Sequence, residues 1–213
     1  MIKNRLLKIY VSFIVIVLGS TILYALPVNP VSTESAIKKI DRFERIHLNT
    51  IFAIKDMVSL EELSDVIIKA EVLAERENLE LLEGSYGFTK TKLKVTKVYS
   101  GNLKVDDIIV LGEEYFQYTD NNTGEVCMQA INLYEPTIIG DEYIFFLFDK
   151  GEADTARENV YEIINITDGK FPVPKKTIKT QSSDVLSNSE INIGDGDISK
   201  YKKIYNEVIK KYN

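Results

Sequence analysis

The stretch of residues 88–99, FTKTKLKVTKVY, alternates lysines with Thr, Leu and Val. Side chains of a β-strand point alternately to the two faces of its sheet, so this pattern predicts a strand with one buried and one solvated face. The alternation slips at Lys97 and Val98, which predicts a β-bulge there. The predicted core face carries Thr91, Leu93 and Val95, and the solvated face carries Lys90, Lys92 and Lys94.

Further strand patterns surround this stretch. The β-branched run of residues 66–73, VIIKAEVL, predicts a strand that enters a buried sheet. Residues 78–87 contain two glycines and are expected to form a loop. After a turn at residues 100–102, the run 108–111 predicts a third strand, and the chain stays extended and aromatic to residue 118.

The second half of the chain continues this β-rich pattern. Residues 120–124, DNNTG, are the strongest turn signal and predict a hairpin between 115–118 and 126–130. The apolar run YIFFLF at 143–148 is short enough for a strand that is buried on both sides. A further hairpin is expected between residues 161–166 and 170–173.

Helical patterns lie at the edges of this strand-rich region. Residues 32–45 and 56–63 each predict a short helix with one apolar stripe. Residues 198–213 predict an amphipathic helix that either docks on the barrel, which we favour because a helix commonly closes the open end of a small barrel, or lies on a membrane. Its expected apolar stripe consists of Ile198, Tyr201, Ile204, Tyr205, Val208 and Tyr212.

The N-terminus carries the sequence features of a membrane anchor. Lys3, Arg5 and Lys8 precede an uncharged run from Ile9 to Thr33. About 20 apolar residues in a helix span the hydrocarbon layer, so residues 9–28 are expected to cross the lipid bilayer. The basic flank predicts a cytoplasmic N-terminus and an extracytoplasmic remainder. We favour an uncleaved signal-anchor over a cleaved signal peptide, because the best cleavage site, after Ala25, is poor.

These patterns divide the chain into five parts. Residues 1–30 form the cytoplasmic tip and transmembrane segment, and residues 31–63 a juxtamembrane helical segment. Residues 64–175 are expected to form the β-barrel domain, residues 176–197 a linker, and residues 198–213 the C-terminal helix. The expected fold is mainly β, a small antiparallel barrel with peripheral short helices.

Composition limits the partners of the exterior part. Removing the three N-terminal cations leaves 23 Lys and Arg against 32 acids, a net charge near −9. Such a surface does not favour nucleic acid, which binds clustered cations. The single cysteine cannot form an intramolecular disulfide, so the fold must rest on packing. The preference for Lys, Ile and Asn suggests a bacterial source.

Three segments resemble a known family. They are SDVIIKAEVL from Ser64, LKVTKVYSGNLKVDDIIVL from Leu93, and EPTIIGDEYIFFLF from Glu135. Over roughly residues 60–173 the chain resembles bacterial exported proteins with a netrin-like OB barrel, the fold of the tissue inhibitors of metalloproteinases. The resemblance implies an OB-type barrel. Those inhibitors use an N-terminal cysteine and disulfides, which this chain lacks, so that mechanism is not implied.

Single residues with reactive side chains favour structural roles. His47 is the only histidine, and no nucleophile motif accompanies it. Cys127 lies in an apolar strand with no cation nearby in sequence, so we interpret it as a packing residue. Two acidic pairs are candidate calcium ligands, Asp120 with Glu125 and Asp195 with Asp197, but their spacing does not match an EF-hand loop. No cofactor or metal is therefore expected.

Two larger sets were considered as sites. A hydrolase would need two carboxylates held together in space, and the candidates are Glu113, Glu114, Glu135 and Asp141. A binding face for protein or glycan would use stacked aromatics, and the candidates are Tyr115, Phe116, Tyr118 and Tyr134. Packing in the core is the favoured interpretation of these aromatics, because such residues are good strand formers.

The sequence thus predicts a non-catalytic, membrane-anchored, extracytoplasmic binding or accessory module. Its expected partners are the bilayer, through residues 9–28, and an envelope or extracellular protein or glycan. The alternatives are a cell-surface hydrolase that uses carboxylates, and a secreted protein-binding or inhibitor-like domain released by signal cleavage.

Overall fold

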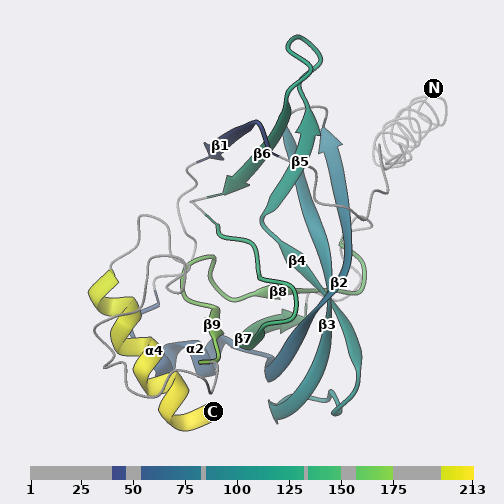
Figure 1. The fold of residues 1–213 in the computed structure, drawn as a ribbon. Helices are drawn as coiled ribbons and strands as arrows, with labels where there is room; N and C mark the ends of the chain where they lie inside the picture. Colours follow the sequence, from purple (N-terminus) through teal and green to yellow (C-terminus); the bar gives the residue numbers. More distant parts are fainter. Residues whose placement is uncertain (1–39, 47–53, 83–84, 132–133, 150–156, 175–197) are drawn as a thin grey trace, which may run out of the picture.

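Five strands of the chain close on themselves around an apolar interior (Figure 1). The computed structural model describes residues 40–46, 54–82, 85–131, 134–149, 157–174 and 198–213. The expected transmembrane segment, residues 9–28, and the expected linker, residues 176–197, lie outside these ranges. None of the helices in the described part of the chain is long and apolar enough to cross a bilayer.

The five closing strands pair in the order β2-β3-β4-β8-β7, and β7 pairs back onto β2. Four of these pairings are antiparallel, whereas β4 and β8 pair in parallel, so the expected all-antiparallel sheet is corrected at that seam. The parallel seam arises because the chain leaves β4, builds a separate hairpin and β7, and returns beside β4. The strands are β2 (Val66–Leu82), β3 (Tyr86–Ser100), β4 (Ile108–Glu113), β7 (Glu142–Asp149) and β8 (Val160–Ile163).

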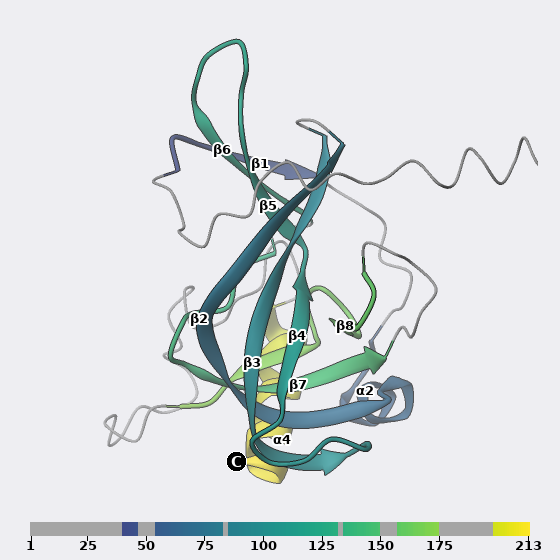
Figure 2. The same ribbon diagram turned by 90° about the vertical axis from the view of Figure 1, so that its right-hand side faces the viewer.

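Strand β3 confirms the alternation of its sequence. Thr91, Leu93 and Val95 are all fully buried. Around the predicted bulge the register with β2 shifts at two of its four irregular points, and these shifts leave Thr96 and Tyr99 without a paired residue in β2. Bulges bend a strand and increase its twist, which allows β3 to curve around the closed sheet (Figure 2).

The expected loop at residues 78–87 is wrong. Pairing between β2 and β3 continues through Leu79 and Phe88 to Leu82 and Tyr86. Gly87 lies inside β3, where an added Cβ would sit 2.3 Å from the carbonyl oxygen of Leu79. This glycine therefore permits a close approach within the sheet rather than a turn.

A second sheet has the order β1-β6-β5. It consists of β1 (Arg42–Ile46), β6 (Val126–Ile131) and β5 (Tyr115–Thr119). The antiparallel pairing of β5 with β6 confirms the hairpin predicted from the turn at 120–124. The helix expected at residues 32–45 is wrong at its C-terminal end, because residues 42–46 form a strand parallel to β6. Residues 32–39 lie outside the described part of the chain. Backbone pairing with β6 replaces a helix too short to be stable alone.

The expected hairpin between 161–166 and 170–173 is also wrong. Strands β8 and β9 (Lys170–Pro172) do not pair with each other; both run antiparallel to β7 along the same edge. The amide of Phe146 donates to Gly169, and Ile164 donates to Phe146, so residues 164–169 loop out between the two strands. Strand β7 is long and apolar, so β8 and β9 form more extensive pairing and bury more surface against it than they could against each other.

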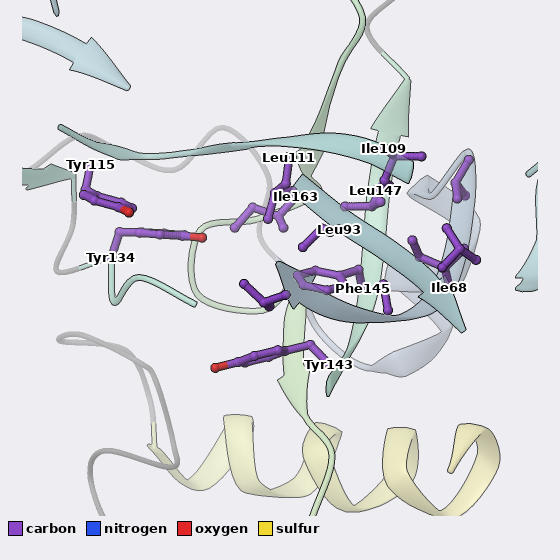
Figure 3. Close-up of a cluster of buried hydrophobic side chains, with 14 of the residues drawn as sticks. Ile68, Leu93, Ile109, Leu111, Tyr115, Tyr134, Tyr143, Phe145, Leu147 and Ile163 are labelled. Carbon is purple, nitrogen blue, oxygen red and sulfur yellow. The ribbon is translucent and has the colours of Figure 1, made fainter. Parts of the chain in front are cut away.

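Strand β7 is buried on both faces, as its sequence predicts. Tyr143, Phe145 and Leu147 face the interior, where they meet side chains from the other strands (Figure 3). Ile144 and Phe146 face the opposite way and contact the C-terminal helix.

Helix α4 (Ile198–Tyr212) covers that outer face together with α2 (Met57–Leu63). Docking of the helix is confirmed, but the helix packs on the outer face of β7 and β2 rather than at an open end of the closed sheet, because that outer face is apolar. Tyr212 donates to Glu61 over 2.7 Å, and Lys211 pairs with the same carboxylate at 2.8 Å. The buried residues of the stripe are Tyr201, Ile204, Tyr205, Val208 and Tyr212.

Candidate functional site

The aromatic residues considered as a binding face lie mainly inside the protein. Tyr115, Phe116 and Tyr134 are buried, and only Tyr118 is partly exposed. The rings of Tyr115 and Tyr134 stack with their centroids 6.3 Å apart at one end of the core (Figure 3). The rings of Phe116 and Tyr118 stack at 5.7 Å. The packing interpretation therefore holds for the three buried residues.

A carboxylate lies at this end of the core. Glu113, at the end of β4, is fully buried. Its Oε1 accepts from the hydroxyl of Tyr134 at 3.0 Å and from the amide of Thr137 at 2.8 Å. Its Oε2 accepts from the hydroxyl of Thr91. A buried charge is tolerated only when it is paired and hydrogen-bonded, and these donors meet that need.

Arg76 from β2 is the nearest cation to this carboxylate. Its Nη2 lies 3.9 Å from Oε2 of Glu113. The same nitrogen donates to the carbonyl of Thr137 and, at 3.0 Å, to its hydroxyl, while Nη1 donates to the hydroxyl of Tyr115 at 2.9 Å. The guanidinium thus connects β2, β5 and the segment that follows β6.

Lys170 brings a second cation to the cluster. Its ammonium group donates to the carbonyl of Glu135 and lies 3.7 Å from the ring centroid of Tyr134. Burial lowers the pKa of Lys170 to about 7, an effect that Arg76 reinforces and that Glu113 and Glu135 oppose. This ammonium group therefore titrates near neutral pH.

The buried charges hold one loop, residues 134–141, which links β6 to β7. Besides the bonds to Glu135 and Thr137, the amide of Ile138 donates to the hydroxyl of Tyr143 at 3.1 Å. The amide of Gly140 donates to Val72 at 2.8 Å. The loop backbone faces inward, and the side chains of Ile138 and Ile139 remain 52% and 45% exposed.

The sequence of residues 136–141, PTIIGD, predicts only a break between strands. The signal that was available is the pair of adjacent isoleucines between Pro136 and Gly140, since turns are usually polar. The sequence could not show which carbonyl each buried cation would contact, because the partners are distant: Arg76 and Thr137 lie 61 residues apart.

The carboxylates considered for a hydrolase belong to separate environments. Glu113 lies in the core, whereas Glu114 pairs with Arg157 at 2.9 Å. Arg157 also pairs with Glu162 and lies 4.4 Å from the ring centroid of Phe88. The other two candidates are on the loop, Glu135 exposed and Asp141 half-buried. The acids thus do not form a single paired site.

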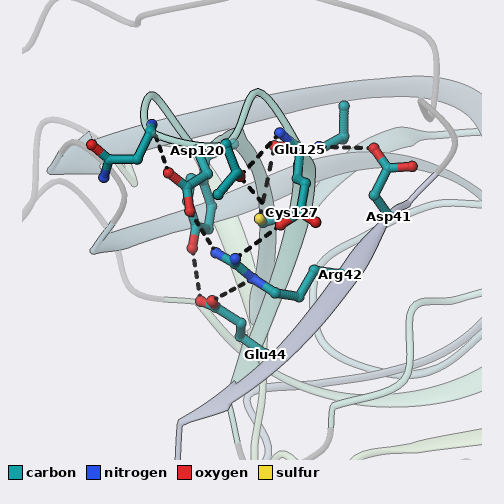
Figure 4. A network of polar contacts seen from close by, with 10 residues as sticks. Asp41, Arg42, Glu44, Asp120, Glu125 and Cys127 are labelled. Carbon is teal, nitrogen blue, oxygen red and sulfur yellow. Dashed lines mark hydrogen bonds and ion pairs between the residues drawn. The ribbon is translucent and has the colours of Figure 1, made fainter.

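One of the two candidate calcium pairs, Asp120 with Glu125, converges on an arginine (Figure 4). Arg42 of β1 contacts Asp120 at 2.8 Å and Glu125 at 2.9 Å. It also lies 3.0 Å from Glu44, and the hydrogen bond from Arg42 is the largest factor that lowers the pKa of Asp120. A guanidinium therefore occupies the place between these two carboxylates.

Cys127 lies in β6 beside this cluster and is fully buried, which agrees with a packing role. Its thiol contacts the carbonyl of Glu125 at 3.8 Å. A cation that is distant in sequence lies beside Cys127, since Arg42 is its direct partner in the parallel pairing of β1 and β6. That neighbour comes from 85 residues earlier in the chain, where local sequence could not reveal it.

His47 and the pair Asp195 and Asp197 lie outside the described residues. Within the described ranges, no group of three or more His, Cys, Asp or Glu side chains is placed to hold a metal ion. Comparison of the chain with protein-family models, with curated proteins and with solved structures finds no match.

Proposed function

We propose that the chain is an extracytoplasmic binding or accessory module, held in the cell membrane by residues 9–28. The proposal gives it a single membrane pass with a cytoplasmic N-terminus. Support comes from the N-terminal flank of the uncharged run, which contains three cations and no acidic residue. The partner is a protein of the cell envelope or the exterior.

The proposed scaffold is an OB-type, netrin-like barrel. Support comes from the closure of five strands and from the parallel pairing of the third with the fifth of them, β4 with β8. A separate hairpin inserted between β4 and β7, and a helix packed outside β7, elaborate that scaffold. OB-type barrels carry many functions, so the function must be argued from the surface.

The loop 134–141 carries the proposal of binding. Its backbone is bonded to Arg76, Glu113 and Lys170, so two large apolar side chains are displayed at fixed positions. Exposed apolar residues on a rigid support are suited to contact another protein. Glu113 meanwhile accepts three hydrogen bonds from its neighbours, which suits a structural role better than proton transfer.

The proposal can be tested in the cells that naturally produce the chain. A photo-crosslinking amino acid is placed at Ile139 or, as the control, at Val58 of α2, which is 56% exposed. We expect a discrete crosslinked protein from position 139 and none from position 58. Identical crosslinks from the two positions would contradict a binding role for the loop.

Topology is tested separately with a C-terminal epitope tag. External protease added to spheroplasts is expected to remove the tag and to leave the membrane-held N-terminus. A tag that remains protected until the membrane is dissolved would contradict the extracytoplasmic location.

A further inference from the structure

We propose that the loop 134–141 and the adjoining bulge of β2 dock a cationic, amphipathic segment of a partner protein. This inference rests on the proposed binding function and specifies its partner. Apolar contact would come from Ile138 and Ile139, and cations of the partner would face the acidic side chains around them.

The apolar centre continues from the loop onto β2. The β2–β3 register passes from Val72 opposite Leu93 directly to Arg76 opposite Thr91, so residues 73–75 bulge from the sheet. The backbone of Val72 bonds to the loop at both Gly140 and Asp141, which places the bulge alongside the loop. Within the bulge, Ala74 is exposed and Leu73 is half-buried.

Acids predominate around this apolar centre, although the exposed Lys92 of β3 lies opposite the bulge. The loop and the first residue of β7, residues 134–142, contain three acidic residues and no Lys or Arg. Glu135 of the loop and Glu75 of the bulge are exposed. Glu71 lies directly opposite Glu142 in the pairing of β2 with β7, although Lys94 flanks Glu71 on its other side. Like charges that are directly opposed destabilise a sheet, so a cation from a partner would relieve this pair.

The negative charge around the apolar centre determines which kind of partner can bind this surface. An anionic bilayer would be repelled by the acidic rim. A second copy of the chain would bring the same rim and a net charge of −6, so self-association is disfavoured. A segment with apolar side chains on one face and Lys or Arg on the other matches both features. The bond between Arg76 and Thr137 keeps the one nearby arginine of β2 buried and away from this surface.

The test uses the full chain in nanodiscs of zwitterionic lipid, with empty nanodiscs as the blank. Three labelled helical peptides serve as probes: one of Leu and Lys, a matched one of Leu and Glu, and one of Ser and Lys. We expect the Leu/Lys probe to bind at least tenfold more tightly than the other two. Its affinity is expected to fall as salt is raised, since exposed charges are screened.

Three variants localise the binding. Ile139→Ser and Glu75→Gln are each expected to lower the affinity for the Leu/Lys probe at least threefold. The first change removes an apolar contact, and the second removes a negative charge beside it. Val58→Ser, at a comparably exposed apolar side chain on α2, is expected to leave the affinity unchanged. The two loop-region changes are at exposed positions, so the fold is retained, which circular dichroism verifies.

Equal binding of the Leu/Glu probe, or unchanged affinity in both Ile139→Ser and Glu75→Gln, would overturn the proposal. The absence of binding by every probe would also overturn it. These results are distinguishable from failure of the proposed function, because crosslinking at position 139 in cells reports a partner of any charge.

Discussion

Arginine meets carboxylates in two regions of this protein, and the two regions differ in burial. Arg76 and Glu113 lie under the loop 134–141, with 6% and 0% of their side chains exposed. Arg42 lies at the β5–β6 hairpin, where its side chain is 37% exposed and that of Glu125 is 43% exposed. Figure 1 places this hairpin at one end of the molecule and α2 with α4 at the other.

The difference shows that the distance between the charged groups does not by itself determine how much an ion pair contributes to stability. The contacts of Arg42 are the shorter ones, at 2.8–3.0 Å, yet solvent screens them and exposed pairs contribute little. The pair of Arg76 and Glu113 is longer, but removing one partner leaves a buried charge without compensation. We therefore expect the buried region to control stability and the exposed region to adjust only the local position of β1.

The sharpest test of this comparison is Glu113→Ala. The change leaves Arg76 as an uncompensated buried cation and is expected to lower the free energy of unfolding by about 3–5 kcal/mol. Chemical denaturation of the full chain in detergent measures it. The matched change Glu125→Ala is expected to have a far smaller effect, and equal losses would contradict the comparison.

The second test uses the pH dependence of stability. The pKa of Lys170 is lowered to about 7 by burial, so between pH 7 and its ordinary value of 10.5 the unfolded chain binds a proton that the folded chain does not. Stability should therefore rise with pH from 7 to 9, by at most about 1.4 kcal/mol per pH unit from this group. Below pH 7 both states are protonated, and this contribution is constant.

Lys170→Met should remove that part of the slope. The control Lys210→Met, at an exposed position on α4, should keep it. Stability is measured by denaturation at pH 6–9. Parallel slopes for the wild type and Lys170→Met would show that the ammonium group is not the source.

A smaller effect is expected for Tyr134→Phe. The change removes the hydroxyl that donates to Glu113 but retains the ring between Tyr115 and Lys170. Loss of one buried hydrogen bond to a charged group should cost about 1–3 kcal/mol. Tyr118→Phe, which removes the hydroxyl that donates to the partly exposed Glu44, is the matched control and should cost less.

The smallest effect is expected for Arg42→Ala. The unfolding midpoint should change little, and the change should become smaller still in high salt because the contacts are exposed. Thermal unfolding at low and high salt measures both quantities. A loss as large as that of Glu113→Ala would mean that β1 and its arginine are integral to the core.

Several elements of the fold were predictable because their signals are local. The alternation in β3, the turn at 120–124 and the apolar run of β7 each correspond to an observed element. Asp56 and Ser59 form a capping box that starts α2 close to its predicted position. In α4 the spacing of apolar residues matches the helical period, and the face that it predicts is buried.

The candidate site was predictable only in part. The aromatic residues Tyr115 and Tyr134 were recognised together, and the structure stacks them against each other. Their burial agrees with the packing interpretation. Their polar partners could not be foreseen, because Arg76 lies 39 residues from Tyr115 and Glu113 lies 21 residues from Tyr134. The loop 134–141 was not predicted as a site, since its position depends on buried charges from β2, β4 and β9.

Local sequence patterns predict a β-rich domain with a C-terminal amphipathic helix, because the periods of 2 and 3.6 residues and the turn residues act over a few positions. The pairing partners of the strands follow from the packing of the whole chain. Residues 42–46 became a strand because β6 offered an edge, and β8 and β9 both joined β7 rather than each other. Pairing between distant segments depends on chain closure and on which surfaces remain available, and a local pattern contains neither.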